Sequence, residues 1–287
     1  MHIGAIFIIL GASLFGVFAP IVIKIFRLES LDFAITLGKF FGAGVITATG
    51  FIHVFPAAVT ALSDPCLPEF FTEYSASAGF FALVAVLLSH LIQFLAEGKF
   101  LQAFGEKDSE EEGASVPSHG HAHGALISEN QKRTLSTYIL ELAIGIHSVI
   151  IGMDLGVSAS EFTTLLIALC FHQFFEGIGL GYRIAEIKYK RKLFGYLSSF
   201  VYAITTPLGV AIGIAMRLNQ SETSASGALV TGVLDAAAAG ILIYSSMLLI
   251  MEEFGLGFRK MTKARQAFCF VSFYAGCGLM ATLGLWA

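Results

Sequence analysis

Two short runs inside long apolar segments carry the residue types that could do chemistry in this chain. One starts at His147 and reads His-Ser-Val-Ile-Ile-Gly, and the other starts at His172 and reads His-Gln-Phe-Phe-Glu-Gly. A charged residue in the middle of an apolar span costs about 2.5–3.5 kcal/mol on the insertion scale, so such residues are functional candidates by default. Imidazole and carboxylate without thiolate suit zinc(II), iron(II) or manganese(II).

The spacing places these side chains where they could share a metal ion. His172 and Glu176 are four residues apart, so on a helix they lie one turn apart on the same face. His147 and His172 lie near the middle of consecutive spans, and antiparallel packing brings them to one depth. Ser148 and Gln173 follow the two histidines and would supply oxygens or hydrogen bonds around the ligands. The sequence therefore predicts a metal site in the plane of the membrane.

The packing around this site is expected to depend on glycine. Gly152 and Gly177, together with Gly179 and Gly181, should let the two helices approach closely. The alternative interpretation of the polar residues is a hydrogen-bonded network that only holds helices together. Two histidines and a glutamate at matched depth favour the metal site.

The composition indicates an integral membrane protein. Of the 287 residues, 56% are hydrophobic and 13% are charged, against about 25% charged in soluble domains. Eight segments reach the spanning length of about 20 residues. They are predicted near Ile3–Phe26, Phe33–Thr60, Ala78–Glu97, Thr137–Val157, Phe162–Tyr182, Leu193–Met216, Ala228–Met251 and Ala267–Trp286. We expect an all-α membrane protein of eight transmembrane helices, without a soluble catalytic domain.

Basic residues set the expected orientation. They cluster in the odd-numbered connections between spans, whereas the even-numbered connections hold only Arg217. The positive-inside rule then places the odd connections in the cytoplasm and both termini outside. The net charge of −4 is small, and these basic clusters give no sign of nucleic-acid binding.

The spans are expected in a 3+2+3 arrangement. Residues 1–97 hold the first three spans, residues 137–182 the central metal-binding pair, and residues 193–287 the last three. Because each outer group has an odd number of helices, the two groups run in opposite directions. That is compatible with the inverted repeats of transporters, whose site lies at the midplane.

Residues 98–136 form the long predicted loop on the cytoplasmic side. Its charged composition, rich in small residues, argues for disorder. It carries alternating histidines, His119, His121 and His123, and His-rich tracts often bind metal weakly. A solvated linker is the alternative. Because metal would reach this loop only after passage, a sensor or buffer role is favoured over capture.

Other polar residues are candidates for the path of the ion. Asp154 is seven residues after His147, on the same face and nearer the outside. It either draws cations to the site or lies in water at the helix end. Glu141, on the cytoplasmic side, either lines an exit path or makes a structural hydrogen bond. Asp235 is expected to cap or pair at the outer end of the seventh span.

The paired runs resemble those of the ZIP (Zrt-, Irt-like protein) family of divalent-metal transporters, in its eukaryotic branch. That branch shows His-Ser-x-x-x-Gly on the fourth helix and His-Gln-x-x-Glu-Gly on the fifth, and both stand intact here. The eight spans, the outward termini and the His-bearing third loop agree, and the resemblance covers nearly the whole chain. Further matches lie at Ala5–Leu10, Phe51–Pro56 and Ala239–Tyr244.

The resemblance implies a role for each residue of the paired runs. His147, His172 and Glu176 would hold the metal, with Ser148 and Gln173 at the adjoining positions. It also suggests a place on the entrance path for His53, which could equally be a core histidine. The family moves metal into the cytoplasm.

The chain departs from the family pattern at several positions. Ala57 stands where an acidic residue usually follows the His-x-x-Pro of the second helix, and Leu249 stands where a glutamate is common on the release path. Glu252 and Glu253, one turn on, would partly replace that glutamate. Asp154 takes a position where a small neutral residue is usual.

The leading hypothesis is an importer of divalent metal that is not an enzyme and needs no cofactor. The resemblance favours zinc as the ion and the plasma membrane as the location, with iron(II) and manganese(II) as other substrates. A non-transporting metal sensor is the alternative, motivated by Ala57 and Leu249. An intramembrane zinc hydrolase is disfavoured because the chain lacks a His-Glu-x-x-His helix. The expected partners are the metal ion and the lipid bilayer, and the sequence leaves a homodimer open.

Overall fold

The computed structural model describes residues 2–25, 32–111, 129–158, 162–187, 189, 191–218 and 225–285. Within these residues the chain is helical without strands, and eight helices are long and apolar enough to cross a membrane. This confirms the predicted all-α membrane fold. Most span boundaries lie within four residues of those predicted, but the seventh candidate span continues to Arg259, eight residues beyond the predicted Met251.

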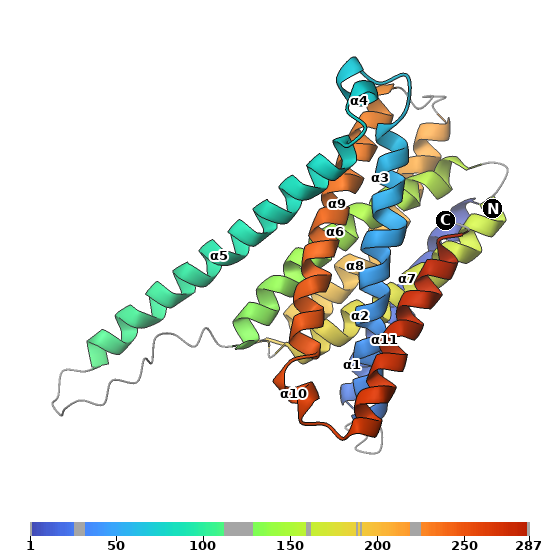
Figure 1. The fold of residues 1–287 in the computed structure, drawn as a ribbon. Helices are drawn as coiled ribbons and strands as arrows, with labels where there is room; N and C mark the ends of the chain where they lie inside the picture. The colour runs from blue at the N-terminus through green and yellow to red at the C-terminus, as the bar shows by residue number, and fades with distance from the viewer. Residues whose placement is uncertain are drawn as a thin grey trace.

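The order of the helices along the chain places both termini at one end of the bundle (Figure 1). We call this the termini end, which also holds α4, and the opposite end the α10 end. The helices are α1 (His2–Ile25), α2 (Asp32–Ala48), α3 (Phe55–Leu62), α4 (Glu69–Glu73), α5 (Ser77–Glu111), α6 (Glu129–Val157), α7 (Phe162–Glu186), α8 (Leu193–Leu218), α9 (Ala225–Glu253), α10 (Leu256–Arg259) and α11 (Lys263–Leu283).

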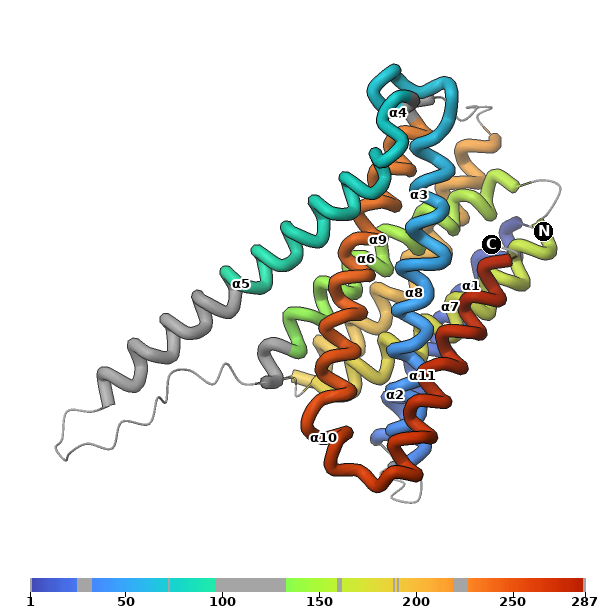
Figure 2. The backbone as a smooth tube through the Cα atoms, viewed as in Figure 1, coloured from blue at the N-terminus to red at the C-terminus, as the bar shows by residue number. Residues whose placement is uncertain are grey.

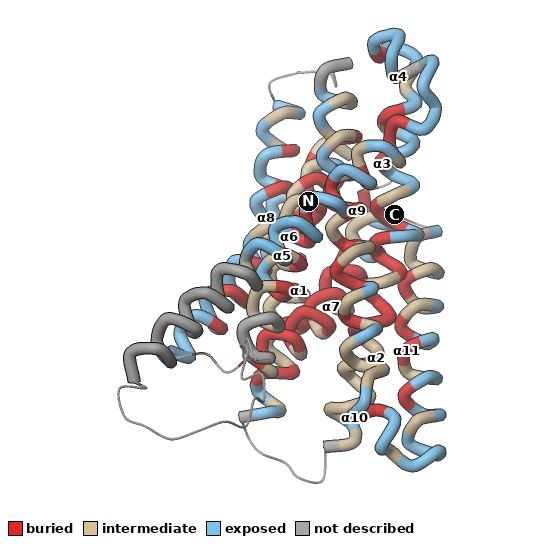
Figure 3. The backbone as a smooth tube through the Cα atoms, turned by 60° about the vertical axis from the view of Figure 1, so that its left-hand side comes forward, coloured by how far each residue is buried: buried red, intermediate tan, exposed pale blue. Residues whose placement is uncertain are grey.

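The spans pack as two groups, which can be followed along the backbone in Figure 2. The first group consists of α1, α6, α7 and α8, and the second of the α2–α3 span, α5, α9 and α11. The groups meet where α6 packs on α9 and α2 packs on α7. In the second span, α6, α7 and α9, half of the most apolar 18-residue window is buried, against 17% in α11 (Figure 3). The outer faces carry exposed apolar side chains, as contact with lipid requires.

The second span is not one continuous α-helix. Between α2 and α3 the chain forms a π-helix, Thr49–Val54, which contains the buried His53. Pro56 lies at the start of α3 and has no N–H to donate, so it interrupts the regular hydrogen-bond ladder at this point. π-Helical turns are rare and often occur at functional sites.

Glycines bring helices together, but not in the pairing that the sequence predicts. A methyl group added at Gly152 would collide with the backbone of α8, and one at Gly177 would lie 3.0 Å from a backbone nitrogen of α1. These glycines therefore draw α6 to α8 and α7 to α1, rather than α6 to α7. Gly179 faces Gly42 on α2, and this contact joins the two groups.

The long third connection is shorter in the structure than the predicted 98–136 loop. Helix α5 continues to Glu111 and α6 begins at Glu129. Strong helix formers such as Lys, Gln, Ala and Glu in the flanks favour this extension over the predicted disorder. His119, His121 and His123 lie outside the described residues, so their role stays a prediction.

Candidate metal centre

Three imidazoles gather in the interior where the two helix groups meet. His53 comes from the π-helix, His147 from α6 and His172 from α7. The ring centroid of His53 lies 4.8 Å from that of His172 and 5.6 Å from that of His147. The centroids of His147 and His172 are 5.7 Å apart. Their exposed fractions are 9% for His53, 0% for His147 and 1% for His172.

Two buried carboxylates accompany these rings. The Oε2 atom of Glu176 lies 3.5 Å from Nε2 of His172, one helical turn away on α7. The Oδ1 atom of Asp235, on α9, lies 3.5 Å from Nδ1 of His147. The expectation that Asp235 caps or pairs at the outer helix end is wrong, because α9 starts ten residues earlier and carries it into the interior. Asp235 lies seven residues, about two turns, inside the predicted seventh span, and this depth was the signal that could have identified it.

The polar atoms of this group are largely without hydrogen bonds. Neither ring nitrogen of His147 or His172, and neither carboxylate oxygen of Glu176, has a hydrogen-bond partner. Leaving a buried polar group unsatisfied costs about 1–3 kcal/mol, so the arrangement suits an additional ligand. Nitrogen and oxygen donors of this kind match divalent transition metals. Among the described residues no three such side chains already converge enough to hold a metal ion, so binding would need side-chain movement.

Ser148 and Gln173 lie beside the histidines, as their sequence positions require, and both are buried. The Nε2 atom of Gln173 donates to Oγ of Ser148 at 3.4 Å, which joins α7 to α6. The Tyr202 hydroxyl on α8 donates to the backbone oxygen of Gln173 at 2.5 Å. The Oε1 atom of Gln173 keeps no partner. This amide oxygen adds a further potential ligand beside the imidazoles.

The structure brings Asp154 toward this group but not Glu141. Asp154 is exposed on α6, seven residues or about two turns beyond His147 toward the termini end, on the same face of the helix. Glu141 instead accepts a hydrogen bond from Ser198 on α8. It lines an open groove of about 500 Å³ between α6 and α8. Its geometry therefore fits the structural role that the sequence left open.

Glu252 and Glu253 lie at the α10 end and carry their own cations. Arg133 contacts Glu252 at 2.6 Å, Arg183 contacts Glu252 at 2.7 Å, and Lys39 contacts Glu253 at 3.0 Å. Glu186 joins them, 2.6 Å from Lys39 and 2.8 Å from Arg133. We call these six residues the ion-pair network. It connects the two helix groups, since Lys39, Glu252 and Glu253 belong to the second group and the rest to the first.

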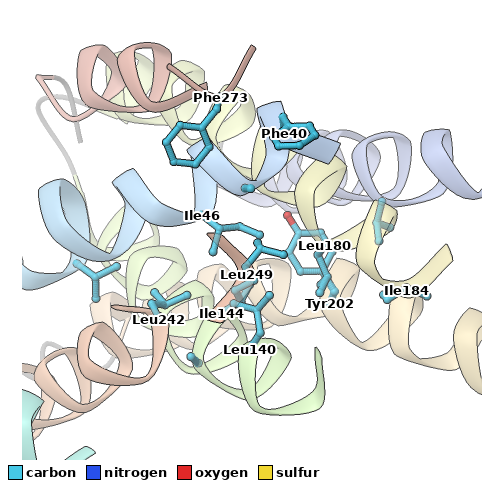
Figure 4. Packing of buried hydrophobic residues seen from close by; sticks show 14 of the residues in the cluster. Phe40, Ile46, Leu140, Ile144, Leu180, Ile184, Tyr202, Leu242, Leu249 and Phe273 are labelled. Atoms are coloured by element: carbon cyan, nitrogen blue, oxygen red, sulfur yellow. The ribbon is translucent and has the colours of Figure 1, made fainter. Parts of the chain in front are cut away.

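An apolar layer separates the metal centre from the ion-pair network. Its central residues are Ile46, Ile144, Leu180 and Leu249, which pack in one buried cluster (Figure 4). Ile144 and Leu180 lie about one turn from His147 and Glu176 toward the α10 end. The space between Leu249 and the network is about 10 Å³, roughly one water molecule. The apolar layer and the ion-pair network therefore leave little space beside Leu249.

Comparisons with known proteins identify the family. The family model described as ZIP Zinc transporter matches residues 1–284. Zinc transporter 3 of Arabidopsis thaliana is 37% identical over 295 residues, which covers 99% of this chain and 84% of that protein. Fe(2+) transport protein 1 of Arabidopsis thaliana is 32% identical over 294 residues, covering 99% and 84%. Zinc transporter 8 of Oryza sativa subsp. japonica is 34% identical over 307 residues, covering 88% and 78%. The chain belongs to the ZIP family of zinc transporters.

Proposed function

We propose that this protein carries divalent transition-metal ions across a membrane through the buried group of His147, His172 and Glu176. Zinc is the principal substrate, and iron(II) and manganese(II) compete for the same ligands. The observation that supports this function is the set of unpartnered nitrogen and oxygen atoms at the meeting of the two helix groups. Relatives of similar sequence are named for zinc or Fe(2+) transport.

The proposed route runs from the termini end to the α10 end. An ion passes the exposed Asp154, exchanges water for the imidazole and carboxylate ligands, and leaves through the apolar layer. Passage requires Leu249 and its neighbours to part and at least one ion pair of the network to break, which frees Glu252 or Glu253 to receive the metal. Because metal ions bind only while in transit, they are the substrate and not a resident cofactor.

The direction follows from charge. The basic residues at the α10 end favour a cytoplasmic location for this end under the positive-inside rule. The proposed route from the termini end to the α10 end is then inward, with both termini outside. The plasma membrane is the proposed location. Imported metal then meets the 98–136 connection with its three histidines.

Zinc-65 uptake in cells that lack their own zinc importers tests this function. We expect saturable uptake by the wild type and background uptake by His172→Ala and Glu176→Ala, since each removes a ligand. His90→Ala is the matched control: it removes an imidazole from α5 that is exposed and bonded to Tyr244, away from the centre. Unchanged uptake in His172→Ala or Glu176→Ala would show that the site assignment is wrong. Competition by iron(II) and manganese(II) then ranks the substrates.

A non-transporting metal sensor is the second candidate function. The apolar layer favours it, because Leu249 replaces the acidic residue of the family pattern on the release side and the space behind it is about 10 Å³. A sensor would bind zinc at the centre without passing it on. Binding by purified protein together with absent flux would favour the sensor.

A further inference from the structure

Asp235 is a buried carboxylate that the family motifs do not assign to the metal centre. It is 3% exposed, and its Oδ1 atom lies 3.5 Å from Nδ1 of His147. This distance is too long for an effective hydrogen bond. Neither that oxygen nor either ring nitrogen of His147 has a hydrogen-bond partner. Two side chains with unused ligand atoms therefore face each other across the contact between α9 and α6.

The carboxylates of the ion-pair network differ from Asp235 because each of them has a basic partner. Glu186, Glu252 and Glu253 each contact a Lys or Arg side chain at 3.0 Å or less. Asp235 and Asp154, by comparison, form no ion pair with Lys or Arg within the described part of the chain. A buried carboxylate without a cation loses hydration and gains no charge partner. A mobile cation is the partner that this arrangement favours.

Asp154 extends the arrangement toward the termini end. It is exposed on α6, seven residues after His147 and therefore on the same face of the helix. An ion arriving from the termini end would meet the exposed carboxylate first, then the buried carboxylate, and then the imidazole. Because these side chains are successively more buried, the ion would lose its bound water molecules in steps along this path.

We propose that Asp235, with His147 and Asp154, forms a second divalent-cation site that receives the metal before His172 and Glu176 bind it. This site rests on the transport function proposed above and deepens it. Its carboxylate and imidazole ligands suit zinc(II), iron(II) and manganese(II). Because the described side chains do not yet converge on one point, Asp154 turns inward from the helix surface on binding. His147 then serves both sites in turn.

Equilibrium zinc binding to purified protein tests this site without transport. The background variant replaces His119, His121 and His123 of the long connection, together with His172 and Glu176, by alanine. We expect this background to retain one zinc ion. Adding Asp235→Asn to it should weaken zinc binding about tenfold, which corresponds to a loss of about 1.4 kcal/mol of binding free energy. Asparagine keeps the volume and an acceptor oxygen, so a residue that only orients His147 would tolerate the change.

Two further variants complete the binding measurement. Asp235→Glu keeps the charge and should retain zinc, which separates loss of a ligand from loss of folding. Glu73→Gln removes an exposed charge from α4 at the same end of the molecule and should bind like the background. Absent binding in the background variant, or equal binding with and without Asp235→Asn, would overturn the second site.

Measurements of zinc uptake by variants distinguish a failure of this second-site proposal from a failure of the proposed transport function. In an otherwise wild-type chain, Asp235→Asn should raise the zinc concentration for half-maximal uptake about tenfold and leave maximal uptake largely intact, because the central ligands remain. His172→Ala should abolish maximal uptake. If Asp235→Asn matches the wild type while His172→Ala is inactive, the second site is wrong and the transport function stands. If the wild type shows no uptake, the transport function fails, and the binding measurement alone decides the site.

Discussion

At the scale of residues, the protein distributes its buried charges in two ways. The carboxylates of the ion-pair network lie against Lys and Arg side chains, whereas Glu176 and Asp235 lie against imidazole rings. Each unpaired carboxylate in a span is costly. A bound divalent ion would offset this cost, which is why we propose that the ion binds beside Glu176 and Asp235.

The structure raises the question whether His53 is a metal ligand or a core residue, because its ring lies beside those of His147 and His172. Its ring lies closer to His172 than the ring of His147 does. If it supplies a ligand nitrogen, His53→Ala should raise the zinc concentration for half-maximal uptake about tenfold, equivalent to about 1.4 kcal/mol. His53→Phe keeps the ring volume without the nitrogens and should behave the same way. Normal zinc affinity in the phenylalanine variant would identify His53 as a core residue.

At the scale of elements, local irregularities of the helices position the proposed ligands. The π-helix of the second span places His53 beside the rings of α6 and α7. Close contacts at glycine let the backbones approach, above all where Gly42 of α2 meets Gly179 of α7. That contact holds the two helix groups together between the metal centre and the ion-pair network.

Gly42→Ala should therefore destabilise the protein. Its methyl group would collide with the Cα atom of Gly179, and overpacking of this kind costs about 1–3 kcal/mol. Thermal unfolding of the purified protein in detergent measures the effect as a lower Tm. Gly11→Ala on α1 is the control, because nothing lies within 4 Å of its added methyl group. Equal Tm values for Gly42→Ala and the wild type would show that this contact is loose.

The sequence predicted the spans well because the thickness and apolarity of the bilayer set their length and hydropathy, whatever the neighbouring helices are. It also predicted that His172 and Glu176 lie together, from their helical spacing, and that His147 lies near His172, from the matched depth of two antiparallel spans. It did not predict the π-helix, the burial of Asp235 or the partners of Gly152 and Gly177. These depend on which face of each helix meets which neighbour, and no local pattern in a single sequence specifies that.

At the scale of the whole molecule, the metal centre and the ion-pair network both connect the same two groups of helices. The intramembrane hydrolase hypothesis is wrong, because the chain belongs to a family of transporters. In the proposed route, ions enter past the carboxylates toward the termini end and leave through the apolar layer at the α10 end. Movement of one group relative to the other would break the network and open the apolar layer together.

Zinc flux into liposomes that contain only the purified protein tests the central claim most directly, since no other transporter is present. An indicator enclosed in the liposomes reports the ion. We expect saturable flux with the wild type and none with Glu176→Gln, which keeps the shape of the side chain and removes its charge. Flux in Glu176→Gln equal to the wild type, or zinc binding by the wild type without any flux, would contradict transport through this site.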